Sequence, residues 1–535
     1  MSANGHEDGQ STAQIKNANT FNYKWENIVN YTFTIADKHD FTLTGVTSWS
    51  KKQHEESGAI GYNVDWDKYS FHNLGVTDAD GREISSSYVG SQMMSYAIRL
   101  NYSFLGKYLL TVSNRWDGSS MLARGNQWDT FPAAAVAWRI SDEDFIQDID
   151  WISNLKLRVG YGVTGNAGAK EYATLAMGFA GSNLAFQDTP APFYVPAQTI
   201  ANKLLGWEKS YSTNVGVDFS VLRNCINLTL DFYNTDTKDI LFQRTLPASL
   251  GALKTSNYTV WQNICATNNK GFELAVNSRN IETRNFTWTT DFTFAMNKEE
   301  ITEFTSDSPV QNGDYYLMEG QPINTYYDYR YEGIWQEDEA EEAAKYNNAK
   351  PGYIKVTDVD NNYEYTSSDY CVLGSSNPDW TAGMVNSFQI YDFDFSFQLQ
   401  ARYGQTMKAD ILGWYCPSGL YNSPSICDYW TPENPDGRFP RPDINHERMS
   451  NYPANSSLLY VDGSYVKVRN ITLGYTLPKS LLDKWGLSRA RIYATMSNPF
   501  IFTKSKYLRD YDPERGGADT LPLSKQMVFG LNVTF

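Results

Sequence analysis

Oxygen-bearing side chains alternate along residues 358–369, and this spacing is typical of a calcium-binding loop. Aspartate or asparagine stands at loop positions 1, 3 and 5 and a carboxylate at position 12, and hard oxygen ligands of this kind suit Ca²⁺. The candidate ligands are Asp358, Asp360, Asn362, Glu364 and Asp369. Tyr363 replaces the usual glycine of position 6, and Asp369 is shorter than the usual glutamate. A solvated acidic turn is the alternative interpretation, and Ca²⁺ is the one cofactor that the sequence suggests.

Three glycines match a nucleotide-binding pattern. Gly160, Gly162 and Gly165 have the spacing G-x-G-x-x-G, and residues 167–177 after them have helical character. No parallel strand–helix–strand run flanks them, and the neighbouring segments alternate instead of being apolar throughout, as buried parallel strands are. We therefore interpret these glycines as the end of a strand that enters a long loop.

Catalytic constellations are not found in the sequence. The five histidines are His6, His39, His54, His72 and His446. They are scattered along the chain, and the chain has no H-E-x-x-H helix, G-x-S-x-G elbow or G-x-x-x-x-G-K-[ST] loop. The sequence therefore predicts a protein that is not an enzyme.

Cysteine usage is equally uninformative about chemistry. The five cysteines form no C-x-x-C pair, which argues against a metal cluster. Cys416 and Cys427 lie in one Pro/Ser/Tyr-rich stretch. They are interpreted either as a loop disulfide or as two unpaired thiols.

Aromatic residues crowd two long loops, where flat rings with a polar tip could stack on sugar rings. The candidate ligand-binding residues are Tyr327, Tyr329, Trp335, Trp414, Tyr415 and Trp430. The same residue types form interfacial girdles in membrane barrels, and contact with a lid protein would use them equally well. Both interpretations stay open.

Charge and hydropathy exclude several classes of protein. The chain has 45 basic and 61 acidic residues and a net charge of −16, which disfavours nucleic acid as a partner. No run approaches the roughly 18 consecutive apolar residues of a membrane-spanning helix. The N-terminal stretch has neither a basic segment nor an apolar core, so it does not read as a signal peptide. We expect residues 1–24 to be non-native or disordered and residues 25–535 to form a single β domain.

Apolar and polar residues alternate from end to end of the chain. Over residues 393–402 the odd positions are Phe, Phe, Phe, Leu and Ala, and the even positions are all polar. Successive side chains of a strand point to opposite faces, so one face is apolar and the other polar. About fifteen segments behave in this way. They lie near 25–36, 40–50, 94–104, 107–117, 132–141, 155–163, 211–221, 226–238, 268–279, 286–298, 381–391, 393–405, 465–477, 490–500 and 526–535.

Strand length and loop length favour a membrane barrel over a soluble sandwich. Most segments exceed the ~5–6 residues of an average strand and match the ~9–11 residues of a tilted membrane-spanning strand. Tight turns alternate with long polar loops at 51–93, 164–206, 239–267, 299–380 and 406–464, as in outer-membrane barrels. The sequence predicts a short helix at 337–346 and, because the alternation slips phase, a β-bulge near Arg469–Asn470.

Several motifs resemble SusC/RagA-type TonB-dependent outer-membrane transporters, in that family's order. They are the segments 108–120, 131–140, 155–166, 268–274, 377–380 and 464–475, and the terminal Phe535. The resemblance covers nearly the whole chain from residue 25 onward. It implies an importer of oligosaccharides or peptides in the outer membrane of a Gram-negative bacterium. An Asp/Asn/Gly-rich stretch at the position of residues 358–369 is also frequent in the family.

The family's barrel has about twenty-two strands, with an N-terminal plug that engages the TonB complex and a SusD-like lipoprotein lid. This sequence departs from that pattern, since it has about seven strands too few, no TonB box and no plug domain. The expected fold class is therefore all-β: a partial antiparallel transmembrane β-barrel with long extracellular loops. We expect such a chain to be truncated and not competent for transport alone, because unpaired strand edges are costly in lipid.

Polar residues on the inward faces, such as Asp231, Asp291, Asp394, Gln398 and Arg402, would contact a plug or hydrate the passage. Two alternatives to the transporter remain. A passive outer-membrane porin shares the alternation. A soluble glycan-binding β-protein, such as a propeller, would have shorter strands.

Overall fold

The structure is a computed structural model that describes most of the 535 residues. The described residues are 11–63, 70–180, 184–186, 189–191, 194–196, 199–247, 249, 258–306, 308–446, 449, 452, 454–483, 486–517 and 521–535. Contacts divide the chain into two compact units. The first unit comprises Met1–Val136, Gly160–Ser212 and Thr237–Cys265, and the second comprises Ala137–Val159, Thr213–Asp236 and Ala266–Phe535.

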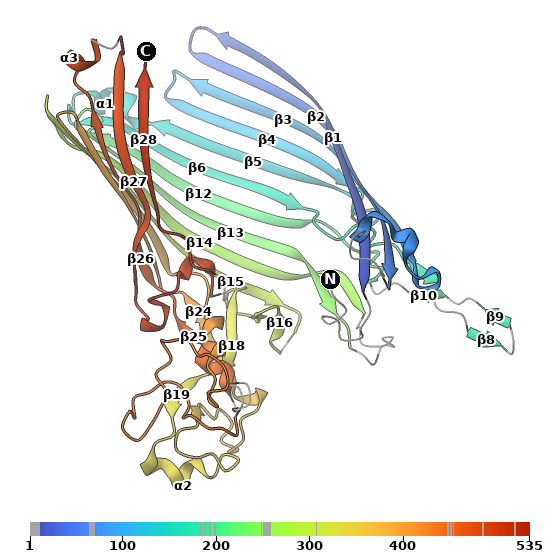
Figure 1. Cartoon of the computed structure of the whole chain (residues 1–535). Coiled ribbons are helices and arrows are strands. Elements are labelled where there is room, and N and C mark those ends of the chain that lie inside the picture. Colours follow the sequence, from blue (N-terminus) through green and yellow to red (C-terminus); the bar gives the residue numbers. More distant parts are fainter. Residues whose placement is uncertain are drawn as a thin grey trace. The chain divides into compact units, whose positions relative to one another are not determined.

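One sheet contains fifteen long strands in a hydrogen-bonded path that follows the order of the chain. These strands are β1 (Thr12–Ile35), β2 (His39–Tyr62), β3 (Glu83–Phe104), β4 (Tyr108–Ser119), β5 (Trp128–Arg139), β6 (Ile152–Asn166), β12 (Glu208–Val221), β13 (Ile226–Thr245), β14 (Thr259–Glu282), β15 (Phe286–Phe304), β22 (Trp380–Ile390), β23 (Phe393–Tyr403), β26 (Tyr465–Thr476), β27 (Arg489–Thr503) and β28 (Gln526–Thr534). Each of the fifteen predicted segments coincides with one of them, so the predicted all-β fold is confirmed. Figure 1 shows β1 to β5 as long neighbouring ribbons.

Shorter elements occupy the connections. The short strands are β7 (Gly178–Ala180), β8 (Leu184–Phe186), β9 (Thr189–Ala191), β10 (Tyr194–Pro196), β11 (Thr199–Ile200), β16 (Val310–Asn312), β17 (Tyr315–Leu317), β18 (Thr325–Tyr329), β19 (Tyr331–Ile334), β20 (Ile354–Val356), β21 (Tyr370–Ser375), β24 (Thr406–Lys408) and β25 (Tyr460–Asp462). The α-helices are α1 (Asp144–Gln147), α2 (Ala340–Ala343) and α3 (Lys479–Leu482). The helix predicted at 337–346 is confirmed in part, as a 3₁₀ turn at Glu337–Glu339 followed by α2.

Long and short connections alternate along the path, as predicted. Three residues join β1 to β2 and β3 to β4, and Leu105 and Gly106 of the second turn both have positive φ, which suits a tight hairpin. Since consecutive strands of a meander run in opposite directions, these turns lie at one end of the strands and the long loops at the other. In the second unit, Figure 1 shows β18, β19, β24, β25 and α2 gathered beyond one end of β26, while α1 and α3 lie at the other end.

The apolar faces of the long strands are exposed. In β28, Phe529 is 73% exposed and Leu531 is 62% exposed. In β1 and β2, Trp25 stands opposite Trp49, and further along the same face Phe33 stacks on Phe41 at 4.9 Å between ring centroids. The eight residue steps from Phe41 to Trp49 span about 27 Å of strand, comparable with the roughly 25 Å apolar band of outer-membrane barrels and its flanking aromatic girdles. These apolar faces therefore lack a covering second layer among the described residues.

A single sheet with one exposed apolar face does not fit the soluble glycan-binding alternative. A propeller divides its strands among separate four-stranded blades, whereas the fifteen long strands here follow one path. No helix among the described residues is long and apolar enough to cross a membrane.

The predicted β-bulge is confirmed. Gln398 of β23 pairs with Asn470, and the next residue, Leu399, pairs with Val468, so Arg469 is the extra residue of β26. The register against β27 shifts at the same place. The bulge restores the apolar residues on both sides of it to one face, which explains the phase slip in the sequence.

Two boundaries differ from those predicted. Residues 12–24 form the first half of β1 and pair with β2 over their whole length, so the expected disorder is not found there. Residues 1–10 lie outside the described residues. Strands β1, β2 and β14 reach 24 residues each, longer than the predicted segments. Their ladders continue into regions that the sequence assigns to loops, because backbone pairing does not require a regular alternation of apolar and polar side chains.

The two faces of β23 should respond oppositely to charge. Phe397 lies on the apolar face, whereas Ser396 lies on the polar face opposite Ser387 and Thr472. Phe397→Arg should lower the free energy of unfolding from a lipid bilayer by about 2–4 kcal/mol, because it places a charge near the middle of the apolar band. Ser396→Arg should cost much less. Denaturant titration in phospholipid vesicles measures both, and equal losses would contradict the assignment of faces.

Candidate functional site

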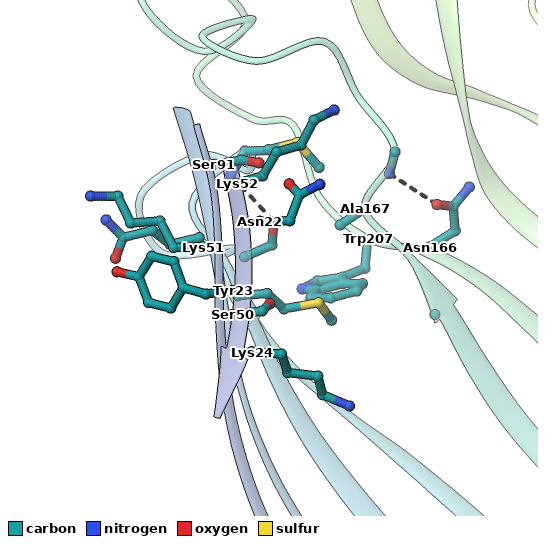
Figure 2. Close-up of a pocket in the computed structure, with 16 residues that line it drawn as sticks. Asn22, Tyr23, Lys24, Ser50, Lys51, Lys52, Ser91, Asn166, Ala167 and Trp207 are labelled. Atoms are coloured by element: carbon teal, nitrogen blue, oxygen red, sulfur yellow. Dashed lines mark hydrogen bonds between the residues drawn. The ribbon is translucent and has the colours of Figure 1, made fainter. Parts of the chain in front are cut away.

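Polar side chains of β1 to β4 line a cavity of about 570 Å³ in the first unit. Figure 2 shows that Asn22 and Lys52 point toward the side on which Trp207 lies, whereas Tyr23 and Lys51 point to the opposite side. Successive residues therefore alternate between faces. The cavity combines amide, hydroxyl and ammonium groups with the apolar side chains of Met93, Met121 and Trp207, which suits a ligand that has both polar and apolar parts.

Most of the charge on this polar face is paired. The Nζ of Lys24 lies 2.9 Å from a carboxylate oxygen of Glu26, and the Nε of Arg115 lies 2.7 Å from Asp117. Lys52 lies 4.0 Å from Glu171, at the limit of an ion pair. The face therefore offers hydrogen-bonding groups rather than a strong field of one sign.

The second unit has a comparable cavity of about 550 Å³, formed by the polar faces of β13, β14, β15, β22 and β23. The predicted inward residues Asp231 and Gln398 both line it, together with Glu273 and Gln400. Since these side chains come from strands far apart in sequence, the cavity shows that the predicted polar faces lie on one side of the sheet.

Ion pairs cross the polar face where glycine leaves room. Arg158 lies 3.0 Å from Asp218 and 3.2 Å from Asp231, and a Cβ on Gly216 would collide with the Arg158 and Asp231 side chains. The predicted inward residue Asp394 accepts a hydrogen bond from Nε of Arg491 at 2.8 Å, again beside a glycine. The remaining predicted inward residues are Asp291, which accepts from the amide of Asn277, and Arg402, which pairs across the ladder with Thr381.

The aromatic loop residues divide into two groups. Trp335, Tyr415 and Trp430 are 3–4% exposed, and Tyr415 and Trp430 belong to the hydrophobic core of the loops in the second unit. Two of the three polar tips are hydrogen-bonded: Trp430 Nε1 donates to Gln336 at 2.9 Å, and the Tyr415 hydroxyl donates to the carbonyl of Pro440 at 2.9 Å. The expectation that these three offer ring faces to a ligand is therefore corrected. They are buried because the loops carry enough apolar surface to form a core of their own.

The other three predicted residues remain accessible. Trp414 is 60% exposed. Tyr327 packs edge-on against Tyr370 at 5.9 Å. Tyr329 lines a loop cavity, and burial together with neighbouring acidic groups raises its pKa to about 12. Cys416 and Cys427 are thiols and form no disulfide with each other.

A buried ion cluster anchors residues 506–517 beside the bulge. Lys467 of β26 is 1% exposed, and its Nζ lies 2.8 Å from Asp512 and 2.7 Å from Glu514. The bulged residue Arg469 reaches Glu514 at 2.6 Å and donates to Gln400 at 2.6 Å. The bulge thus directs one arginine toward this loop, and the loop's Tyr507 and Leu508 join the loop core.

The predicted calcium ligands come together in part. Carboxylate oxygens of Asp358, Asp360 and Asp369 all lie within 4.8 Å of one another. Asn362 lies beside them, since its Nδ2 donates to Asp360 at 3.0 Å. Glu364 is not part of the carboxylate group, and its backbone N–H donates to the Asn362 side chain.

Backbone groups organise this loop around its carboxylates. Asp369 is fully buried and accepts from the N–H groups of Val359 and Thr366, each at 2.8 Å. Burial raises the pKa of Asp358, but the N–H groups of Tyr363 and its neighbours outweigh burial and hold that pKa below its usual value. Tyr363 adopts a positive φ of 64°, the conformation for which a calcium loop normally uses glycine.

Sequence reasoning missed two groups in this region. Lys467 falls on the inward side of the alternation in β26, which was the available signal, but nothing in the sequence connects it to Asp512. The second group is Arg438, whose guanidinium lies over the rings of Tyr331 and Tyr507. It carries no periodic signal, because it lies in an irregular loop.

An antiparallel sheet with an exposed apolar face, a polar face lined by cavities, and long loops at one end defines the class of membrane β-barrels. A family model described as "TonB dependent receptor-like, beta-barrel" matches residues 3–498. The chain belongs to this family, whose barrels reside in the outer membrane of Gram-negative bacteria. The three glycines at 160–165 lie within or at the end of the antiparallel strand β6, as interpreted from the sequence.

Relatives and solved structures agree with this assignment. TonB-dependent receptor P3 of Formosa agariphila is 31% identical over 98% of this chain and 53% of that receptor. TonB-dependent receptor SusC of Bacteroides thetaiotaomicron is 30% identical over 91% of this chain and 48% of SusC. A structure of the RagAB peptide transporter superposes with a TM-score of 0.82 at 23% identity, over 98% of this chain and 57% of that chain. The chain spans about half the length of the curated relatives it matches.

Removing the central lysine of the ion cluster should destabilise the protein. Lys467→Met leaves two buried carboxylates with Arg469 alone, so it should cost about 3–5 kcal/mol of unfolding free energy. Lys506→Met removes an exposed lysine that pairs with Asp428, and it should cost at most about 1 kcal/mol. Denaturant unfolding in detergent, with limited proteolysis of residues 504–517, compares the two. Equal stability of both variants would contradict the anchoring role.

Proposed function

We propose that this chain forms the main part of a TonB-dependent importer of the outer membrane, with oligosaccharides or peptides as substrates. The observation that supports this most directly is the division of the sheet into an exposed apolar face and a polar face with cavities of 550–570 Å³. Most charges on the polar face are paired with a charge of opposite sign. Such a face suits the passage of a substrate that is neutral or carries both signs of charge, rather than the binding of a single ion.

Relatives guide the proposal for substrate and partners. The receptor SusC and the RagAB peptide transporter both resemble this chain. By this resemblance, we propose a SusD-like lipoprotein lid over the long loops and energisation by the TonB complex. The described residues form the sheet and its loops, so the plug through which TonB would act is proposed to come from polypeptide beyond them.

The sheet edges support a requirement for further strands. Among the described residues, β1 pairs with β2 alone and β28 pairs with β27 alone. Unpaired backbone groups cost several kcal/mol each in hydrocarbon. We therefore propose that additional strands join these two edges in the working transporter.

TonB dependence tests the importer against a passive porin. In a host that needs this locus for growth on a defined oligosaccharide or peptide mixture, loss of TonB should abolish uptake, because energy opens the passage. In-frame deletion of the β22–β23 hairpin should abolish it as well. Cells that produce residues 1–535 alone should show no uptake. Uptake that persists without TonB would favour the porin instead.

We also propose that Asp358, Asp360, Asn362 and Asp369 bind one Ca²⁺, whereas Glu364 does not contribute its side chain. The support for this proposal is that three carboxylates lie close together. None of the three forms an ion pair with a lysine or arginine among the described residues. The ion would join the two ends of the 358–369 loop and so stiffen it.

Calcium titration checks the proposal. Asp360→Asn should weaken Ca²⁺ binding at least about tenfold, because it removes a charged oxygen from the site. Asp338→Asn changes an exposed acid outside the group and should leave binding unchanged. Calorimetry on the purified chain, with Mg²⁺ as the competing ion, measures both. Absence of a binding heat, or equal binding by the two variants, would end the calcium proposal.

A further inference from the structure

A cavity of about 430 Å³ lies among the loops of the second unit. Its walls combine aromatic rings with two guanidinium groups, a hydroxyl and the carboxylate of Asp462, which pairs with Lys504 at 2.6 Å. The residues that matter are Tyr329, Tyr331, Tyr460, Arg330, Arg438 and Ser457. They come from β18, β19, β25 and the connections around them, so several long loops build the cavity together.

Arg438 is held rigidly at this cavity by groups that do not neutralise it. Its Nη2 donates to the carbonyl oxygens of Leu458 at 3.0 Å and Tyr460 at 2.9 Å. Its guanidinium carbon lies 4.9 Å from the ring centre of Tyr331 and 5.1 Å from that of Tyr507. The Tyr331 hydroxyl donates to the Arg438 carbonyl at 2.9 Å and fixes the backbone as well. A preorganised guanidinium loses little further freedom when an anion binds.

The charge of Arg438 has no carboxylate partner within ion-pair distance among the described residues. The nearest acids are engaged elsewhere: Asp428 pairs with Lys506 at 2.6 Å, and Asp462 pairs with Lys504 at 2.6 Å. The buried Nε of Arg438 has no acceptor. Burial lowers the pKa of Arg438, because the raising effects of Tyr331, Tyr507 and Asp428 do not offset the loss of solvation.

Arg330 adds a second positive charge to the same wall. It is exposed, and its Nη2 donates to the carbonyl of Val372 at 3.0 Å. The chain has a net charge of −16, yet neither arginine of this cavity forms an ion pair with any residue that the structure describes.

We propose that this loop cavity binds the carboxylate of a substrate, with Arg438 and Arg330 as its cationic contacts. A guanidinium is planar and presents several N–H donors, so it recognises a carboxylate directionally. The adjoining tyrosine rings provide flat surfaces on which a sugar ring or a peptide unit can stack. Acidic sugars and the C-termini of peptides both carry this group. That the bound molecule is then imported rests on the function proposed above.

Direct binding tests the cavity independently of transport. The purified full chain in detergent is titrated with tri-galacturonate and its methyl ester, and with N-acetyl-trialanine and its C-terminal amide. One acid should bind, and its neutral counterpart should bind at least about tenfold more weakly, because it lacks the charged acceptor. Which of the two acids binds identifies the substrate class.

Variants locate the binding. Arg330→Gln changes an exposed side chain and should weaken the acid at least about threefold while leaving the neutral counterpart unchanged. Arg438→Gln should abolish acid binding, and its folding is checked by unfolding in denaturant. Arg441→Gln is the matched control, because Arg441 belongs to the same loop but pairs with Asp443 at 3.6 Å and does not line the cavity.

If neither acid binds, or if Arg330→Gln and Arg441→Gln weaken the acid equally, the proposal is overturned. Binding without TonB-dependent uptake would leave this site standing and refute the importer. TonB-dependent uptake without a preference for carboxylates would support the importer and refute this site.

Discussion

Hydrocarbon provides no hydrogen-bonding partner, so every backbone N–H and C=O group inside a bilayer must be paired within the protein. This constraint accounts for the main features of the chain. Fifteen strands pair in sequence order, so each interior strand satisfies both of its edges. One face of each ladder is then free to be apolar, and residues such as Phe529 and Leu531 are exposed. The two outermost strands are where the constraint is not met by the described residues.

The polar face follows a different rule, which is local neutralisation. Arg158 pairs with two aspartates beside Gly216, and Arg491 pairs with Asp394 beside Gly474. In both places a glycine leaves the space through which a long side chain crosses to a neighbouring strand. Charges arranged in this way keep the interior hydrated and limit the field along it. Arg438, in the loops, differs because its neighbours stabilise its position without neutralising it.

The loops behave as a folded layer rather than as flexible connections. In the second unit their core contains Tyr415, Trp430, Phe439 and Leu458, and all four side chains are almost fully buried. The Lys467 cluster links residues 506–517 of this layer to β26. Because the layer is packed, the positions of its cavity and of its acidic loop are defined by tertiary contacts instead of by local sequence.

The alternation of apolar and polar residues was sufficient to predict the long strands. Side chains of a strand alternate between its faces, and residues such as Phe393, Phe395 and Phe397 therefore mark the apolar face in the sequence. The same period exposed the bulge at Arg469, because an extra residue must shift the phase. The acidic spacing of 358–369 likewise marked a loop whose aspartates do converge. In contrast, period two is weak over residues 12–24, where Asn17 and Asn19 interrupt the more apolar face. It also carries no information about which loop aromatics are buried. Only the tertiary structure decided that Trp430 packs inside while Trp414 is exposed, and that Lys467 meets Asp512. Such contacts join residues far apart in sequence, and they depend on how whole loops pack, which no local pattern records.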